Sequence, residues 1–184
     1  VVLLELAAWM AEARKHNPEK FKRGVIFCWW TGEELGLLGS AQYAKNPLIP
    51  FKQIVSYINL DMVGRMKNNQ LIMQGMGSSS VWKKMVEKRN VAAGFSLQLN
   101  NDPYQPTDIT SIYPKGVPSI ALFTGLHKDY HKPTDDPDTL NYEGLERITK
   151  FTGRLMMDMA GDMERPDYVK VERGNRGMAT RNSM

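Results

Sequence analysis

The sequence predicts a three-layer α/β sandwich, because segments of two kinds alternate along the chain. Short apolar segments rich in β-branched and aromatic residues indicate strands, and longer segments with apolar residues at helical spacing indicate helices. The length of 184 residues is enough for one domain with a substantial core. We therefore expect one sheet with helices on both faces.

The chain opens in a helical pattern. Apolar residues recur at helical spacing over residues 3–11, and Pro18 ends the pattern. The next segment, Gly24–Trp30, is continuously apolar and rich in β-branched and aromatic residues. Such a run is typical of a strand that is buried on both faces in the middle of a sheet.

The alternation continues to residue 159. The remaining strands are expected at 54–60, 70–74, 95–99 and 118–123, and the remaining helices at 35–45, 80–89 and 142–159. Polar residues that accept hydrogen bonds from a first helical turn precede two of these helices. We expect Ser78 or Ser79 to cap the helix at 80–89, and Asn141 to cap the last one.

Composition excludes several classes of protein. The chain has 24 Lys and Arg against 20 Asp and Glu, and these charges are scattered, so we expect no nucleic-acid partner. No apolar run reaches the roughly 20 residues that a membrane-spanning helix needs. The lone cysteine, Cys28, cannot form an internal disulfide and leaves the cellular compartment open.

Three segments place acids or imidazoles just after predicted strands. Glu33 and Glu34 lie in the segment TGEELGLLGS, which follows the first strand. Asp61 closes the strand at 54–60, and His127 and His131 follow the strand that ends at residue 123. In open α/β sheets, ligands bind beyond the carboxyl ends of the strands. The three segments are therefore candidates for a common site.

Each residue alone also has a purely structural explanation. The two glutamates could be first-turn acids favoured by a helix dipole, Asp61 a turn residue, and either histidine a surface residue. Together, Glu34, Asp61 and His131 form a mixed oxygen and nitrogen set that zinc accepts in proteins, and Glu33 remains free as a base. The combination predicts metal-assisted hydrolysis.

The three motifs, TGEELGLLGS, NLDM and YHKPTDDPD, together resemble the co-catalytic zinc aminopeptidase family. That family includes bacterial leucyl-type aminopeptidases, and its relatives include glutamate carboxypeptidase and glutaminyl cyclase. The resemblance covers about residues 1–163. It implies a mixed, mostly parallel sheet, peptide substrates, hydrolysis of N-terminal residues, and two Zn²⁺ per complete catalytic domain.

The resemblance also implies roles for individual residues. Glu33 matches the general base, which takes a proton from the activated water. Glu34 and His131 match zinc ligands, and Asp61 matches a ligand to the other zinc. Tyr130 lies where some members place a phenol that stabilises the oxyanion, although a packed aromatic under the loop is the alternative.

Two features depart from the family pattern. The family has a histidine and a metal-bridging aspartate upstream of the Glu-Glu pair, where this chain offers only His16, on the wrong side of the first helix. We therefore expect the N-terminal part of the catalytic domain to be missing, and the chain to self-associate or to need a companion N-terminal segment. Asp108 fits a carboxylate that contacts metal ligands, or a helix N-cap, but Ile109 and Ile112 replace the family's histidine and aromatic.

The remaining expectations concern the chain's end and the rival functions. Residues 164–184 have little periodicity and are expected to form a linker or tail that could lead to a further module. A single-zinc glutaminyl-peptide cyclase and a non-catalytic domain with the peptidase fold are the alternatives to an aminopeptidase. By analogy with the family, the protein is expected to be exported to the periplasm, the cell surface or the medium.

Overall fold

The computed structural model describes residues 1–161 and 163–173. The helices are α1 (Val2–His16), α2 (Leu38–Lys45), α3 (Trp82–Ala93), the single-turn α4 (Ile109–Ile112) and α5 (Tyr142–Ala160). The strands are β1 (Tyr57–Leu60), β2 (Gln70–Gln74), β3 (Ser96–Leu99) and β4 (Ser119–Phe123). Short 3₁₀ turns occur at Pro18–Lys20, Phe51–Gln53, Met76–Ser78, Tyr113–Lys115 and Pro137–Thr139.

The four strands form one mixed sheet in the order β1-β4-β2-β3. β1 runs parallel to β4, with Leu60 opposite Leu122, and β2 runs parallel to β3. β4 and β2 are antiparallel, with Met73 opposite Leu122. β4 is therefore flanked on both sides, and every residue of it except Phe123 is buried, as its apolar sequence predicts.

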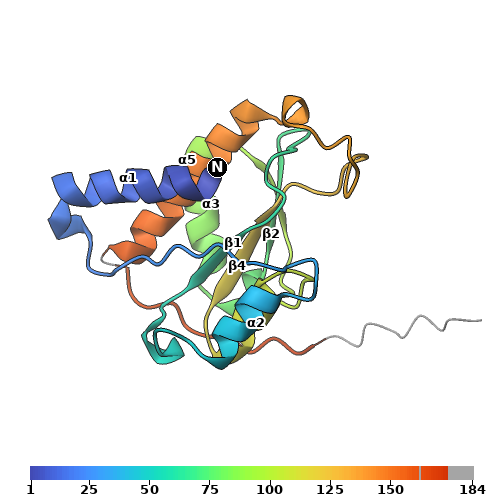
Figure 1. Cartoon of the computed structure of the whole chain (residues 1–184). Coiled ribbons are helices and arrows are strands. Elements are labelled where there is room, and N and C mark those ends of the chain that lie inside the picture. Colours follow the sequence, from blue (N-terminus) through green and yellow to red (C-terminus); the bar gives the residue numbers. More distant parts are fainter. Residues whose placement is uncertain (162, 174–184) are drawn as a thin grey trace, which may run out of the picture.

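Helices cover both faces of the sheet and confirm the three-layer sandwich. α3 and α5 pack on one face, and α1 packs against α5, whereas α2 and α4 lie on the opposite face (Figure 1). The larger core lies between the sheet and the helices α3 and α5. Its fully buried members include Leu71, Met73, Trp82, Ile120, Leu122, Ile148, Phe151 and Leu155. A smaller core under α4 contains Ile109, Tyr113 and Ala121.

One of the two expected helix caps is confirmed. The Asn141 side chain accepts a hydrogen bond of 2.8 Å from the Gly144 amide at the start of α5. The other expectation is wrong, because α3 begins at Trp82 and no side chain caps it. Ser78 is instead buried, where its hydroxyl donates to a backbone carbonyl of β4 (2.7 Å) and accepts from the Trp82 indole (2.8 Å). It ties α3 to the sheet.

The predicted strand at residues 24–30 is absent from the structure. This segment is extended but pairs with no strand among the described residues, and Ile26 and Trp29 are 52% and 56% exposed. An apolar groove of about 950 Å³ separates the segment from β1, which has β4 on one side only. A strand needs a neighbouring backbone at about 4.8 Å, and within the described residues no strand pairs with this side of β1. The apolar sequence therefore lines a groove.

The segment that follows α5 packs back onto the domain. Residues 164–173 contain no helix or strand. Asp167 accepts hydrogen bonds from the Ser80 amide (3.0 Å) and hydroxyl (2.9 Å), and the Val169 amide donates to a carbonyl just before α3 (2.9 Å). The remainder of the predicted tail, 174–184, lies outside the described residues. None of the described helices is long and apolar enough to cross a membrane.

Candidate active site

Glu33 and Glu34 lie in a tight turn rather than in a helix. The expected helix at 35–45 begins only at Leu38, so the proposed stabilisation of these acids by a helix dipole is wrong. The Glu33 carbonyl accepts hydrogen bonds from the amides of Gly36 (3.0 Å) and Leu37 (2.9 Å), which closes the turn. Leu37 adopts a left-handed backbone conformation, with φ at 59°, where α2 starts.

Asp61 follows β1 directly, and its amide donates to the Leu122 carbonyl of β4 (3.2 Å), so it lies beyond the parallel β1–β4 pair. Asp108 is 7% exposed and precedes α4, but its side chain makes no cap hydrogen bond, which contradicts the N-cap alternative. Its buried Oδ1 has no hydrogen-bond partner in the described part of the chain. Burial raises the pKa of Asp108, and the nearby Ser40 hydroxyl opposes this shift.

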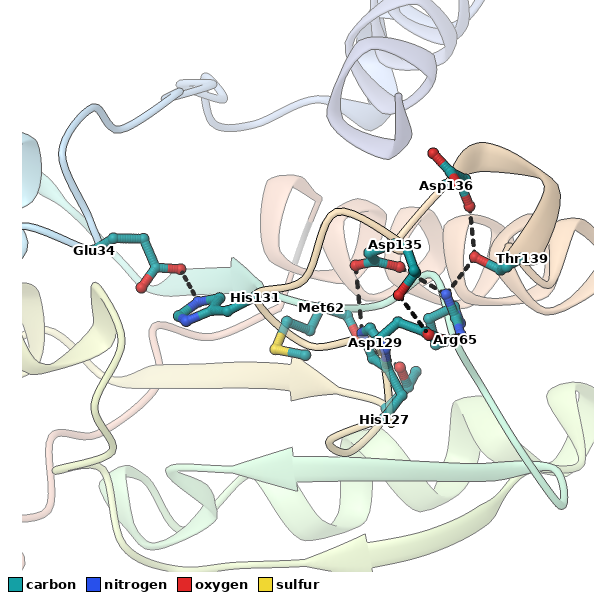
Figure 2. A network of polar contacts seen from close by, with 11 residues as sticks. Glu34, Met62, Arg65, His127, Asp129, His131, Asp135, Asp136 and Thr139 are labelled. Carbon is teal, nitrogen blue, oxygen red and sulfur yellow. Dashed lines mark hydrogen bonds and ion pairs between the residues drawn. The ribbon is translucent and has the colours of Figure 1, made fainter.

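His131 meets Glu34 across the site, because its Nε2 lies 2.8 Å from Glu34 Oε1 (Figure 2). His131 has a φ of 56°, an unusual conformation for a residue other than glycine and one that clusters at functional sites. The Tyr130 ring stacks on the His131 ring at 3.8 Å and is 39% exposed, so it is not packed beneath the loop. Burial and neighbouring carboxylates raise the pKa of the Tyr130 phenol, which therefore keeps its proton.

The carboxylates of the three motifs influence one another electrostatically. Burial raises the pKa of Glu33, and the negative charges of Glu34, Asp61 and Asp108 raise it further, whereas His131 lowers it. Burial also raises the pKa of Asp61, with Asp108 and Glu34 adding to the effect. The site is thus a cluster of mutually repelling acids, which a bound cation would stabilise.

The candidate residues have donor atoms of the types that bind zinc, but too few of these donors lie close together to hold an ion. Glu34 and His131 supply an oxygen and a nitrogen donor that lie 2.8 Å apart, and zinc sites use both types of donor. No group of three or more His, Cys, Asp or Glu side chains within residues 1–161 and 163–173 is close enough to hold an ion. His16 does not contribute, since its Nε2 binds Glu12 on α1 (2.5 Å). A metal ion at this position would therefore need donors beyond those that the described residues bring together.

A polar network that the sequence motifs do not reveal lies beside the site. Arg65 follows β1 by five residues and bonds to Asp129 and Asp135, which lie on either side of His131 in the loop after β4 (Figure 2). Asp135 belongs to the quoted motif YHKPTDDPD, but nothing in the sequence pairs it with Arg65. Only the fold brings the two segments together.

We expect Asp61→Asn to stabilise the metal-free chain at pH 7 by about 1 kcal/mol. A raised carboxyl pKa means that the native state binds more protons than the unfolded state, so stability falls as pH rises above the ordinary carboxyl pKa of about 4. The substitution removes one repelling charge and should flatten this fall. Urea unfolding at pH 5 and pH 7 measures it, with exposed Asp138→Asn as the control. Equal effects of the two substitutions would contradict the repulsive cluster.

An α/β sandwich with carboxylates and an imidazole beyond the ends of its central strands is typical of metal-dependent hydrolases. Similarity to a known protein family shows which group of hydrolases the chain belongs to. The model of peptidase family M28 matches residues 1–156, and the chain belongs to this family.

Individual relatives are aminopeptidases and a cyclase. Leucine aminopeptidase 2 of Arthroderma otae is 26% identical over 92% of this chain and 41% of its own length. A zinc aminopeptidase from Bacillus subtilis shares the fold with a TM-score of 0.61 at 23% identity, over 77% of this chain and 37% of its own. Glutaminyl cyclase from Bacteroides thetaiotaomicron has a TM-score of 0.57 at 19% identity, over 74% of this chain and 49% of its own. The chain thus spans less than half of each relative.

Proposed function

We propose that the chain is the C-terminal portion of a zinc aminopeptidase domain that removes N-terminal residues from peptides. One observation carries the proposal: Glu34 and His131, from motifs far apart in the sequence, are in contact at 2.8 Å, and Glu33 and Asp61 belong to the same electrostatic cluster. Membership of peptidase family M28 supports peptide hydrolysis, and a zinc aminopeptidase shares the fold.

In this proposal Glu34, Asp61 and His131 hold zinc, with two ions in the complete domain. Bound zinc would polarise the peptide carbonyl and acidify a water molecule. Glu33 serves as the general base that takes the proton from the attacking water and delivers it to the leaving amine. Its raised pKa favours this role, since a base is most effective when its pKa approaches the working pH.

Two further residues support the reaction. Tyr130 keeps its proton, so its hydroxyl donates a hydrogen bond to the oxyanion that forms on the peptide carbonyl. Asp108 does not bind substrate in this proposal. Its buried Oδ1 has no partner among the described residues, and it would accept a hydrogen bond from a ligand that the companion N-terminal segment supplies, and so orient that ligand.

We also propose that a companion N-terminal segment completes the site. The groove between residues 24–30 and β1 favours this, because an added strand would pair with the free edge of β1 and cover Ile26 and Trp29. Such a strand would place its own residues at the same sheet edge as Asp61. Without it, the exposed apolar surface favours self-association.

Export to the periplasm, the cell surface or the medium remains part of the proposal by analogy with the family. Peptides are the proposed partners, and the scattered charges of the chain give no reason to propose a nucleic acid.

The experiment that tests the function offers the complete domain two substrates, an aminoacyl-nitroanilide and a peptide with an N-terminal glutamine. An aminopeptidase releases nitroaniline. Cyclisation without nitroaniline release would replace the proposal by a glutaminyl cyclase, a candidate that the shared cyclase fold supports. Turnover of neither substrate would indicate a non-catalytic domain with the peptidase fold.

A further inference from the structure

The loop that carries His131 has little regular structure of its own. Residues 124–136 between β4 and the turn at Pro137–Thr139 contain no helix or strand. Short backbone hydrogen bonds close turns within it, from the amides of Lys132 to Asp129 (2.9 Å) and of Asp135 to Lys132 (3.1 Å). The position of His131 must therefore be fixed by contacts between this loop and the rest of the domain.

A single guanidinium supplies several of those polar contacts. Arg65 Nη2 lies 2.6 Å from Asp129 Oδ2, and Arg65 Nη1 lies 2.7 Å from Asp135 Oδ1. Nη1 also donates to the Thr139 hydroxyl, so the guanidinium bonds to three residues of the loop region. Figure 2 shows these residues grouped around Arg65, with His131 of the same loop pointing away from the group toward Glu34, which comes from a different segment.

The inner pair of the network is nearly buried, whereas Asp135 is 39% exposed, so Arg65 and Asp129 form its strongest constraint. The side chains of Arg65 and Asp129 are 11% and 10% exposed. Asp129 also accepts from Thr134 (3.0 Å), and the hydrogen bond from Arg65 is the main cause that lowers the pKa of Asp129. The buried His127 ring has Nε2 at 3.6 Å from Asp135 Oδ2. Charge-assisted, forked hydrogen bonds of this kind fix both distance and direction.

The geometry couples two candidate zinc ligands. Arg65 lies four residues after Asp61, in the irregular segment that leaves β1, and its partner Asp129 lies two residues before His131. His131 adopts its left-handed backbone conformation inside the turn that Asp129 and Lys132 close. Strained conformations persist only where the surroundings enforce them.

We propose that Arg65 is a positioning residue that clamps the loop at 124–136 to the segment after β1 and so holds His131 in reach of Glu34 and Asp61. The role of His131 as a zinc ligand rests on the proposed function, but the positioning of His131 by Arg65 does not. Arg65 touches no reacting group, since it acts through Asp129 and Asp135.

The test compares Arg65→Met with Arg89→Met in the 184-residue chain. Arg89 serves as the control, because it also forms a partly buried ion pair, with Asp158 between α3 and α5 and with Nε 2.6 Å from Asp158 Oδ2, away from the site. Amide hydrogen exchange in the Arg65 variant should accelerate about tenfold or more at Tyr130, Lys132 and Asp135. It should stay unchanged at these amides in the Arg89 variant. Unchanged exchange at these amides in Arg65→Met would overturn the clamp.

A second measurement reports on the His131 ring itself. The chain has three histidines, so its imidazole NMR spectrum is simple. In Arg65→Met the His131 ring should lose its contacts with Tyr130 and Glu34. Its chemical shift should therefore move toward that of exposed His16. Arg65→Lys, which keeps the charge without the fork, should give an intermediate position and provides a well-folded variant if the methionine variant unfolds. A His131 signal that does not move in either variant would refute positioning.

Neither measurement uses zinc or substrate. A failure of the clamp and a failure of the peptidase function are therefore separate results. If the complete wild-type domain cleaves no peptide while the Arg65 variants still release His131, the clamp stands and only the proposed chemistry falls.

Discussion

Glu33→Gln in the complete domain should lower turnover of an aminoacyl-nitroanilide about a hundredfold or more, while zinc content stays unchanged. Glutamine has the shape of glutamate but cannot accept and return a proton. Glu33 is not in contact with His131 as Glu34 is, so its replacement should leave the metal donors in place. Steady-state kinetics and elemental analysis on the same preparation measure both effects.

The neighbouring glutamate provides the control. Glu34→Gln removes a charge one residue away but also weakens the donor that contacts His131, so we expect zinc to be lost together with activity. The contrast between the two substitutions separates a base from a ligand. Full turnover by the Glu33 variant would remove Glu33 from the mechanism, and zinc loss in that variant would show that it is a ligand instead.

The sequence predicted the fold correctly for segments whose local pattern matches the packing or strand pairing that the rest of the domain offers them. The apolar segment 118–123 became the central strand β4, and the amphipathic segment 142–159 became α5, with its Asn141 cap in place. Gly24–Trp30 has an equally apolar sequence but forms no strand. Composition predicts that a segment will be buried when it can be, but a strand also requires a backbone partner, and that partner lies elsewhere in the sequence or outside it.

The candidate site shows the same division. The three motifs were sufficient to select Glu33, Glu34, Asp61 and His131 as candidates, although the strand expected before Glu33 is absent. The structure puts Glu34 in contact with His131 and puts Asp61 within electrostatic reach of Glu33. The Arg65 network could not be predicted, because a salt bridge between two irregular segments depends on how their turns fold. Asp129 and Asp135 resemble ordinary loop acids until Arg65 is seen between them.

Zinc content should depend on the companion segment. We expect about two zinc ions per chain in a polypeptide that includes an upstream segment filling the groove, and at most one, weakly held, in the 184-residue chain. The reason is the donor count, since Glu34 and His131 form a pair and no three donors within the described residues meet. Two ions need more donors than such a pair supplies, including one that bridges them.

Elemental analysis of both chains measures the ratio, and Cys28 provides an independent control for docking. This lone cysteine lines the groove, so an added strand should slow its reaction with a thiol reagent whether or not zinc binds.

Slow labelling with two zinc ions supports the two-metal aminopeptidase, and slow labelling with one ion favours the cyclase. Slow labelling without zinc would mean that the completed fold keeps its carboxylates for another purpose. Fast labelling would show that the segment does not occupy the groove, and the donors missing from this site would then have to come from a different surface.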